Sequence, residues 1–89
     1  MQALSIKVTG RVQGVFFRAS TREKALELGI KGWCQNEADG SVSIHAEGNE
    51  SQLAQFLEWC GQGPRMAKVE TLEKKEVAVS GLAGFGIRR

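Results

Sequence analysis

The stretch LSIKVTGRVQGVFFRASTREKALELG, residues 4–29, decides the fold, because the spacing of its apolar residues changes halfway along it. Residues 4–9 alternate between apolar and polar, which predicts a strand with one buried face. From Phe17 onward, apolar or small residues recur every three or four positions, which predicts one face of a helix; they are Phe17, Thr21, Ala25 and Leu28. Gly29 suits the left-handed position after a helix. We therefore expect a strand, a glycine-containing loop over Gly10–Phe16 and a helix that ends at Leu28.

Two further strands and a tight turn are predicted next. Ile30–Asn36 is a strand candidate, and Asp39-Gly40 in the following turn is the strongest short hairpin signal in the chain. Ser41–Glu47 alternates cleanly. The alternation places Val42, Ile44 and Ala46 inward and Ser43, His45 and Glu47 outward.

The last third of the chain predicts a helix and two strands. Asn49 is a good N-cap with Gln52 three residues later, the pattern of a capping box. Apolar residues at helical spacing follow as far as Cys60, and glycines then end the helix. We expect a fourth strand within Ala67–Val77 and a short final strand over Phe85–Arg88.

The order of elements predicts the fold class. It reads β-α-β-β-α-β plus a short C-terminal strand, and alternation on one strand face favours helices on one side only. The α+β fold that satisfies this order is the ferredoxin-like two-layer sandwich, a split β-α-β unit with two helices on one face of an antiparallel-type sheet. Its first two strands run parallel with the third between them. We expect one domain over residues 1–89, in which the loop after Thr9 converges with Asn36 at one sheet edge.

Composition excludes several classes of protein. The 89 residues carry 12 Lys and Arg against 10 Asp and Glu, a net charge of +2, which does not favour a duplex-DNA binder. No apolar run is long enough to span a bilayer, and the N-terminus does not resemble a signal peptide. Two cysteines and one histidine do not suit a common zinc site. We expect a cytoplasmic protein with reduced thiols, without metal, membrane or nucleic-acid partners.

Two segments carry groups suited to phosphate chemistry. The loop that enters the first helix leaves backbone N–H groups unpaired, and such amides form a nest for an anion. Arg18 in the first helical turn is unfavourable beside the positive end of the helix dipole unless an anion lies there too. Asn36, at the same edge, offers a donor and an acceptor that could orient a water molecule. By general rules alone, Arg18 could instead be a solvated residue, and Asn36 could simply initiate the turn.

These segments resemble the two signatures of the acylphosphatase family. One is G-R-V-Q-G-V-x-F-R, matched from Gly10 to Arg18, and the other is G-W-V-x-N-x-x-D-G-x-V, matched from Gly32 to Val42. Cys34 stands where the family usually has Val, and Ser43 where an acidic residue is common. The resemblance covers essentially the whole chain.

The resemblance implies a ferredoxin-like monomer that hydrolyses acyl phosphates to carboxylate and phosphate without a metal ion or other cofactor. It implies that Arg18 and Asn36 are catalytic, with Asn36 orienting the water. It also implies a phosphate-binding loop that would hold the substrate, inorganic phosphate or another anion; this loop consists of Gln13, Gly14, Val15, Phe16 and Phe17.

Two other functions compete with this one. A non-catalytic anion-binding or partner domain of the same fold occurs inside larger carbamoyl-transfer maturation proteins; because this chain ends after one domain and keeps both catalytic residues, we favour the enzyme. An RNA-binding sheet needs exposed aromatics, and the predicted outward positions Ser5, Lys7, Ser43 and His45 supply none. We expect four aromatic residues to serve the core or its margin, namely Phe16, Phe17, Phe56 and Trp59. Trp33 could flank the site, but core packing is favoured. We also expect His45 to lie at the surface, and Cys34 and Cys60 to be buried.

Overall fold

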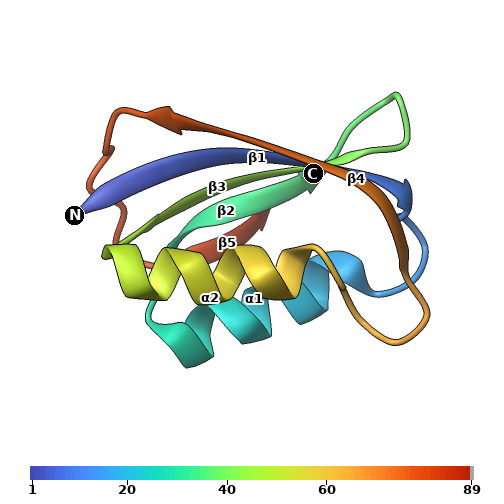
Figure 1. Cartoon of the computed structure of the whole chain (residues 1–89), viewed down its shortest axis with the longest axis horizontal. Helices are drawn as coiled ribbons and strands as arrows, with labels where there is room; N and C mark the ends of the chain where they lie inside the picture. Colours follow the sequence, from blue (N-terminus) through green and yellow to red (C-terminus); the bar gives the residue numbers. More distant parts are fainter. Residues whose placement is uncertain (89) are drawn as a thin grey trace.

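The computed structural model describes residues 1–88 and has two helices against one face of a five-stranded sheet (Figure 1). The elements confirm the predicted order. They are β1 (Gln2–Arg11), α1 (Phe17–Leu28), β2 (Lys31–Asn36), β3 (Val42–Gly48), α2 (Glu50–Cys60), β4 (Lys68–Val77) and β5 (Phe85–Arg88).

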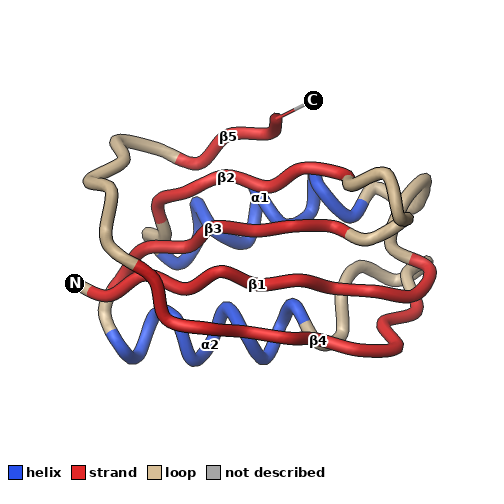
Figure 2. The backbone as a smooth tube through the Cα atoms, turned by 90° about the horizontal axis from the view of Figure 1, so that it is seen from above, coloured by secondary structure: helices blue, strands red, loops and turns tan. Residues whose placement is uncertain are grey.

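The strand order across the sheet is β4-β1-β3-β2-β5, with both helices on one side (Figure 2). β3 pairs antiparallel with both β1 and β2, so β1 and β2 run parallel, as the ferredoxin-like arrangement requires. β5 pairs parallel with β2, which makes the sheet mixed rather than purely antiparallel. The loop over residues 78–84 causes this, because it carries the chain from one sheet edge to the other before β5 begins.

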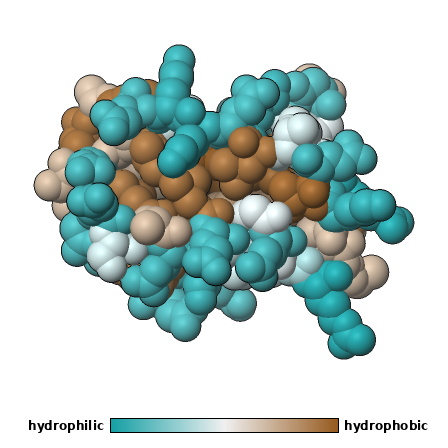
Figure 3. Space-filling model, viewed as in Figure 1, coloured by the Kyte–Doolittle hydropathy of each residue, from teal (hydrophilic) through white to brown (hydrophobic). Residues whose placement is uncertain are grey.

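The core lies between the sheet and the helices. Phe17, Thr21 and Ala25 of α1 are buried against it, as their spacing predicts. α2 begins with the predicted capping box, in which Asn49 Oδ1 accepts from the Gln52 amide at 2.8 Å and Gln52 Oε1 accepts from the Asn49 amide at 2.8 Å. On the face seen in Figure 3, apolar residues gather in a band between polar regions, where the two layers meet.

A bulge near the end of β1 directs the chain into the loop before α1. The register with β4 shifts between Thr9 and Gly10, and Gly10 has a φ of 119°. A Cβ at Gly10 would lie 2.3 Å from the Lys68 carbonyl oxygen, so only glycine fits there. Val12 and Val15 then anchor the loop in the core, a role that the sequence reading did not assign to them.

Glu47 is buried, although alternation predicts that it faces outward. It lies on the sheet face away from the helices, but the loop over residues 78–84 covers it. Its carboxylate accepts from the amides of Ser80, Gly81 and Leu82 and lies 2.8 Å from His45 Nε2. Alternation predicts the sheet face correctly and does not show that a distant loop covers it.

Two aromatic residues also lie outside their predicted positions. Trp33 does not pack in the core; it lies on the open sheet face between the His45 ring, 6.0 Å away between centroids, and Arg88, 4.1 Å from the indole centroid. Phe16 is 76% exposed. The open face therefore has an aromatic side chain after all, and that side chain already contacts His45 and Arg88.

The cysteines follow the prediction, since Cys34 and Cys60 are buried free thiols. Within residues 1–88, no helix is long and apolar enough to cross a membrane. The same residues contain no group of three His, Cys, Asp or Glu side chains placed to hold a metal ion.

Candidate active site

A cavity of about 310 Å³ opens at the sheet edge where β1 and β2 end. The loop before α1 lines one part of it and Asn36 another, so the predicted convergence of the two segments is present. The lining residues are Val12, Gly14, Phe16, Phe17, Arg18, Ala19, Asn36 and Ile87.

Unpaired backbone amides gather at the start of α1. The residue that caps the helix is Phe16, whose side chain has no acceptor, and the first turn contains no acidic residue. Within the described residues, none of the amides of residues 14–18 donates to a protein acceptor. These N–H groups lie at the positive end of the helix dipole, so an anion would be stabilised beside them.

A left-handed backbone shapes this loop. Gly14 has a φ of 74°, and Phe16 has a φ of 63°, the one positive value among non-glycine residues 1–88. A bulky residue in this conformation is strained, by an amount of order 1–3 kcal/mol, and such strain concentrates at functional sites. The strain at Phe16 is therefore a second indication that the loop is built for binding.

Arg18 is half-buried beside these amides. Among residues 1–88, its guanidinium has no ion-pair or hydrogen-bond partner. Its backbone carbonyl lies 3.7 Å from the Sγ atom of Cys34, which joins the first turn of α1 to β2. Burial raises the pKa of the Cys34 thiol to about 11, although the Arg18 charge lowers it slightly, so this thiol stays neutral and cannot pair with the arginine. The Arg18 charge is available to a ligand.

Asn36, the last residue of β2, also lines the cavity. Its Oδ1 atom is buried and has no hydrogen-bond partner within the described chain. A buried acceptor without a partner costs about 1–3 kcal/mol, so native proteins rarely keep one without a functional reason. Asn36 thus has hydrogen-bonding capacity that the fold itself does not use.

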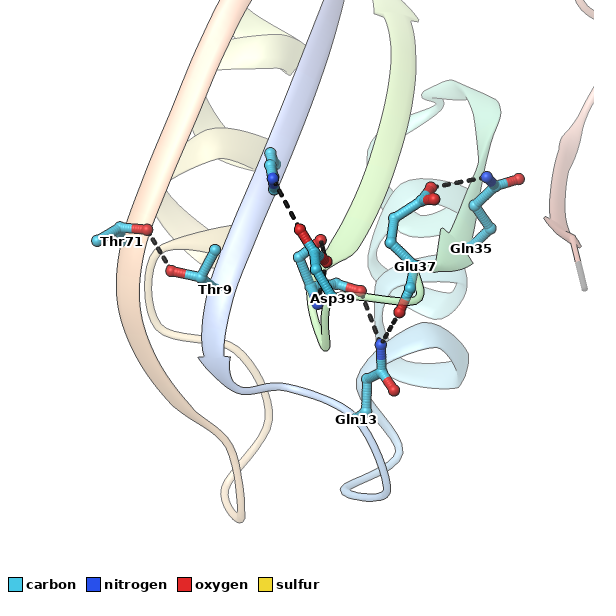
Figure 4. A network of polar contacts seen from close by, with 8 residues as sticks. Thr9, Gln13, Gln35, Glu37, Asp39 and Thr71 are labelled. Atoms are coloured by element: carbon cyan, nitrogen blue, oxygen red, sulfur yellow. Dashed lines mark hydrogen bonds and ion pairs between the residues drawn. The ribbon is translucent and has the colours of Figure 1, made fainter.

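Gln13 joins the two halves of the site. Its Nε2 atom donates to the carbonyl oxygens of Glu37 and Ser41, each at 2.9 Å (Figure 4). These carbonyls belong to the turn between β2 and β3, which directly follows Asn36. Gln13 therefore holds the loop before α1 against the segment that carries Asn36.

The turn itself is stabilised by Asp39, as predicted. Its carboxylate accepts from the Ser41 amide at 2.9 Å and the Ser41 hydroxyl at 2.6 Å, and it pairs with Lys7 at 2.9 Å (Figure 4). The hydrogen bonds from Ser41, and to a smaller extent the one from Lys7, hold the pKa of the Asp39 carboxyl well below its usual range. Hydrogen bonds from Gln35 and Ser43 also lower the pKa of Glu37. Both carboxylates are thus ionised and hold the turn in place.

The predicted site residues do not all line the cavity. Val15 is buried in the core, and the Gln13 side chain is committed to the turn. Conversely, Ile87 of β5 lines the cavity and was not predicted. The available signal was the alternation of β5, which puts Ile87 on the same strand face as the core residue Phe85, but the parallel pairing of β5 with β2 could not be inferred from it.

The fold and the cavity define a small two-layer α+β protein with a candidate anion site at one sheet edge. The acylphosphatase family model matches residues 4–87. An acylphosphatase of Nocardioides sp. is 45% identical over 86 residues, which cover 97% of this chain and 87% of the relative. The solved acylphosphatase from Bacillus subtilis has a TM-score of 0.97 and 37% identity and covers 100% of both chains. HypF of T. kodakarensis matches with a TM-score of 0.87 and 32% identity, covering 100% of this chain and 12% of that one.

The chain belongs to the acylphosphatase family. The resemblance inferred from the two sequence signatures is therefore confirmed, and with it the ferredoxin-like α+β fold.

Proposed function

We propose that this protein hydrolyses acyl phosphates to a carboxylate and inorganic phosphate in the cavity between α1 and Asn36. Its membership of the acylphosphatase family identifies it as a hydrolase of this kind. The observation that supports the location is that one cavity brings together three groups without partners among residues 1–88: the Arg18 guanidinium, the amides at the start of α1 and the buried Asn36 Oδ1 atom.

The phosphoryl group is held by Arg18 and by the amides of residues 14–18. An arginine can grip two phosphate oxygens at once, and backbone amides placed before the reaction need no rearrangement as charge develops. In this arrangement Gly14 and Phe16 shape the loop, Val15 anchors it in the core, and Gln13 fixes it to the turn. Phe17 is the first residue of α1, and the positive end of this helix faces the phosphate.

The attacking water is oriented by Asn36. In the hydrolysis, the water oxygen forms a bond to phosphorus while the bond from phosphorus to the bridging oxygen breaks, and the electron pair leaves with the carboxylate. The water's proton passes to an oxygen of the transferred phosphate. Because a carboxylate is a good leaving group, holding the charge and placing the water in line supply the catalysis.

The direct test is hydrolysis of acetyl phosphate in water enriched in ¹⁸O, with a metal chelator present. We expect turnover that the chelator does not reduce, with the label in phosphate rather than in acetate. Label in acetate would show attack at the carbonyl carbon and would contradict the proposed mechanism. Loss of activity on chelation would contradict the metal-free reaction.

We further propose that the chain is one catalytic domain, active as a monomer in the cytoplasm. The fold buries one continuous core, and the two buried thiols are unpaired, as suits a reducing compartment. Sedimentation of the purified protein at the expected monomer mass would support the first part, and a concentration-dependent dimer would contradict it.

A further inference from the structure

Two exposed apolar side chains border the cavity. Among the described residues, large hydrophobic side chains are exposed at Met1, Phe16, Leu26, Met66, Val79 and Ile87. Of these, Phe16 and Ile87 line the same cavity as Arg18 and Asn36, although they come from opposite ends of the chain. The cavity therefore combines polar groups with an apolar rim.

Phe16 is exposed and lies in a left-handed backbone conformation. The residue is in the left-handed region, with a φ of 63° and a ψ of 24°, and 76% of its surface is exposed. The neighbouring Phe17 is 1% exposed, so one ring of the pair fills the core and the other does not. A large apolar ring kept in water in a strained conformation gains stability when a ligand covers it.

Ile87 reaches the cavity from the last strand. In the parallel pairing of β5 with β2, Ile87 lies beside Cys34. Cys34 comes two residues before Asn36 in β2. Phe85, on the same strand face, is buried, whereas Ile87 is 38% exposed and lines the cavity. Arg22 of α1 donates to the Phe85 carbonyl oxygen at 3.1 Å and so fixes β5 beside the helix that begins at the site.

We propose that Phe16 and Ile87 form an acyl subsite, which makes the enzyme favour acyl phosphates with apolar acyl groups. This inference rests on the proposed function, because it requires the phosphate to lie against Arg18 and the loop amides. The phosphate is then fixed, and the acyl group extends toward the mouth of the cavity. Contact with the two side chains removes apolar surface from water on both the protein and the substrate.

The charges at the cavity also favour substrates with apolar acyl groups. Among residues 1–88, Arg18 is the one charged residue that lines it. Since the phosphate engages that arginine, the described part of the chain offers no second cation to receive an acidic group on the acyl part. An acyl group with its own carboxylate would lose hydration there without a partner, whereas a hydrocarbon chain would not.

The test compares acetyl, butanoyl and hexanoyl phosphates, whose leaving groups differ little in basicity. We expect kcat/KM of the unmodified enzyme to rise with chain length, by about tenfold from acetyl to hexanoyl. Two variants remove apolar surface from the rim. Ile87→Thr keeps a β-branched residue in the strand, and Phe16→Asn introduces a residue that tolerates the left-handed backbone. Each should lower the hexanoyl-to-acetyl ratio by about threefold or more.

Val79→Thr and Met66→Asn are the matched controls. Both replace exposed apolar residues outside the cavity, so the ratio should stay that of the unmodified enzyme. As a second measurement, inhibition by inorganic phosphate should not change in Ile87→Thr, because phosphate does not reach the rim.

The outcomes separate the acyl subsite from the proposed function. If all three substrates are hydrolysed and the ratio is the same in the unmodified enzyme and both cavity variants, the acyl subsite is wrong and the proposed function stands. If Ile87→Thr weakens phosphate inhibition and slows every substrate equally, its role is structural and the subsite is also wrong. If the unmodified enzyme hydrolyses none of the three, the proposed function fails and the subsite fails with it.

Discussion

The Nε2 atom of Gln13 lies 2.9 Å from the backbone carbonyl oxygen of Glu37, and the same atom donates to Ser41 at an equal distance. The two residues are 24 positions apart in the chain. Their contact joins the loop that begins α1 to the turn that follows Asn36, so one side chain sets the separation between the groups proposed to hold phosphate and water.

Replacing Gln13 should loosen the site without removing any group that touches substrate. For Gln13→Ala we expect a loss of about 1–3 kcal/mol in the free energy of unfolding, since two partly buried hydrogen bonds disappear. We also expect a higher KM and a lower kcat, because both halves of the site become less well placed. Denaturant unfolding and steady-state kinetics measure these effects. The control is Gln55→Ala, an exposed change on α2; if it matches Gln13→Ala, the link across the site is unimportant.

Removing the Arg18 side chain should nearly abolish turnover. We expect Arg18→Ala to lower kcat by at least about 10²–10³-fold, the usual cost of losing one charge-stabilising donor. Arg18→Lys should not restore the rate, because an ammonium group cannot grip two oxygens in one plane. Arg65→Ala, which removes an exposed arginine outside the cavity, is the control. A rate for Arg18→Lys close to that of the unmodified enzyme would contradict the two-oxygen grip.

Replacing Asn36 should separate activity from stability. Its Oδ1 atom is buried without a partner, so Asn36→Ala removes an unfavourable group from the folded state. We expect the free energy of unfolding to stay the same or rise, while kcat falls by about 10²–10³-fold. Phosphate inhibition should change little, because Asn36 orients water rather than phosphate. A variant that is both destabilised and fully active would contradict the assigned role.

Stability should depend on pH through Glu47. Burial alone raises the pKa of its carboxyl group, but hydrogen bonds from His45 and from the amides of Ser80 and Leu82 outweigh burial and lower it to about 2, from an ordinary 4.5. A carboxyl with a lower pKa in the folded state stabilises the protein above its unfolded pKa. That contribution is therefore present at neutral pH and is lost as the pH falls from about 4.5 toward 2.

The variant Glu47→Gln tests this pH dependence. We expect it to be less stable than the unmodified protein at neutral pH, and its unfolding free energy to change less between about pH 5 and pH 2. Thermal unfolding across this range measures both effects, with Glu58→Gln on the exposed side of α2 as control. An equally steep pH dependence in Glu47→Gln would show that other carboxyl groups cause it.

Local patterns predicted the parts of the fold that depend on neighbouring residues. The bounds of α1 follow from the spacing after Phe17 and from Gly29, which has the left-handed φ of 76° that ends the helix. The capping box at Asn49 follows from two residues three positions apart. Such features are formed within one or two turns of chain, so the sequence contains all their partners.

Features that depend on distant segments could not be predicted in this way. Glu47 is buried because a loop more than 30 residues later folds over it. Phe16 is a large apolar residue of the kind that fills cores, yet it is 76% exposed, in a left-handed backbone conformation that the sequence does not indicate. For the site, the two motifs identified the loop and Asn36, while Ile87 was missed because the parallel pairing of β5 with β2 leaves no local signal.

The most direct test of the proposed function is to measure both acetyl phosphate hydrolysis and phosphate binding for the unmodified chain and for Arg18→Ala. We expect turnover in the unmodified chain, with phosphate as a competitive inhibitor, and the loss of both in a variant that still folds. Phosphate binding by the unmodified chain without any turnover would contradict it, and would instead describe an anion-binding domain that has the fold of the family without its activity.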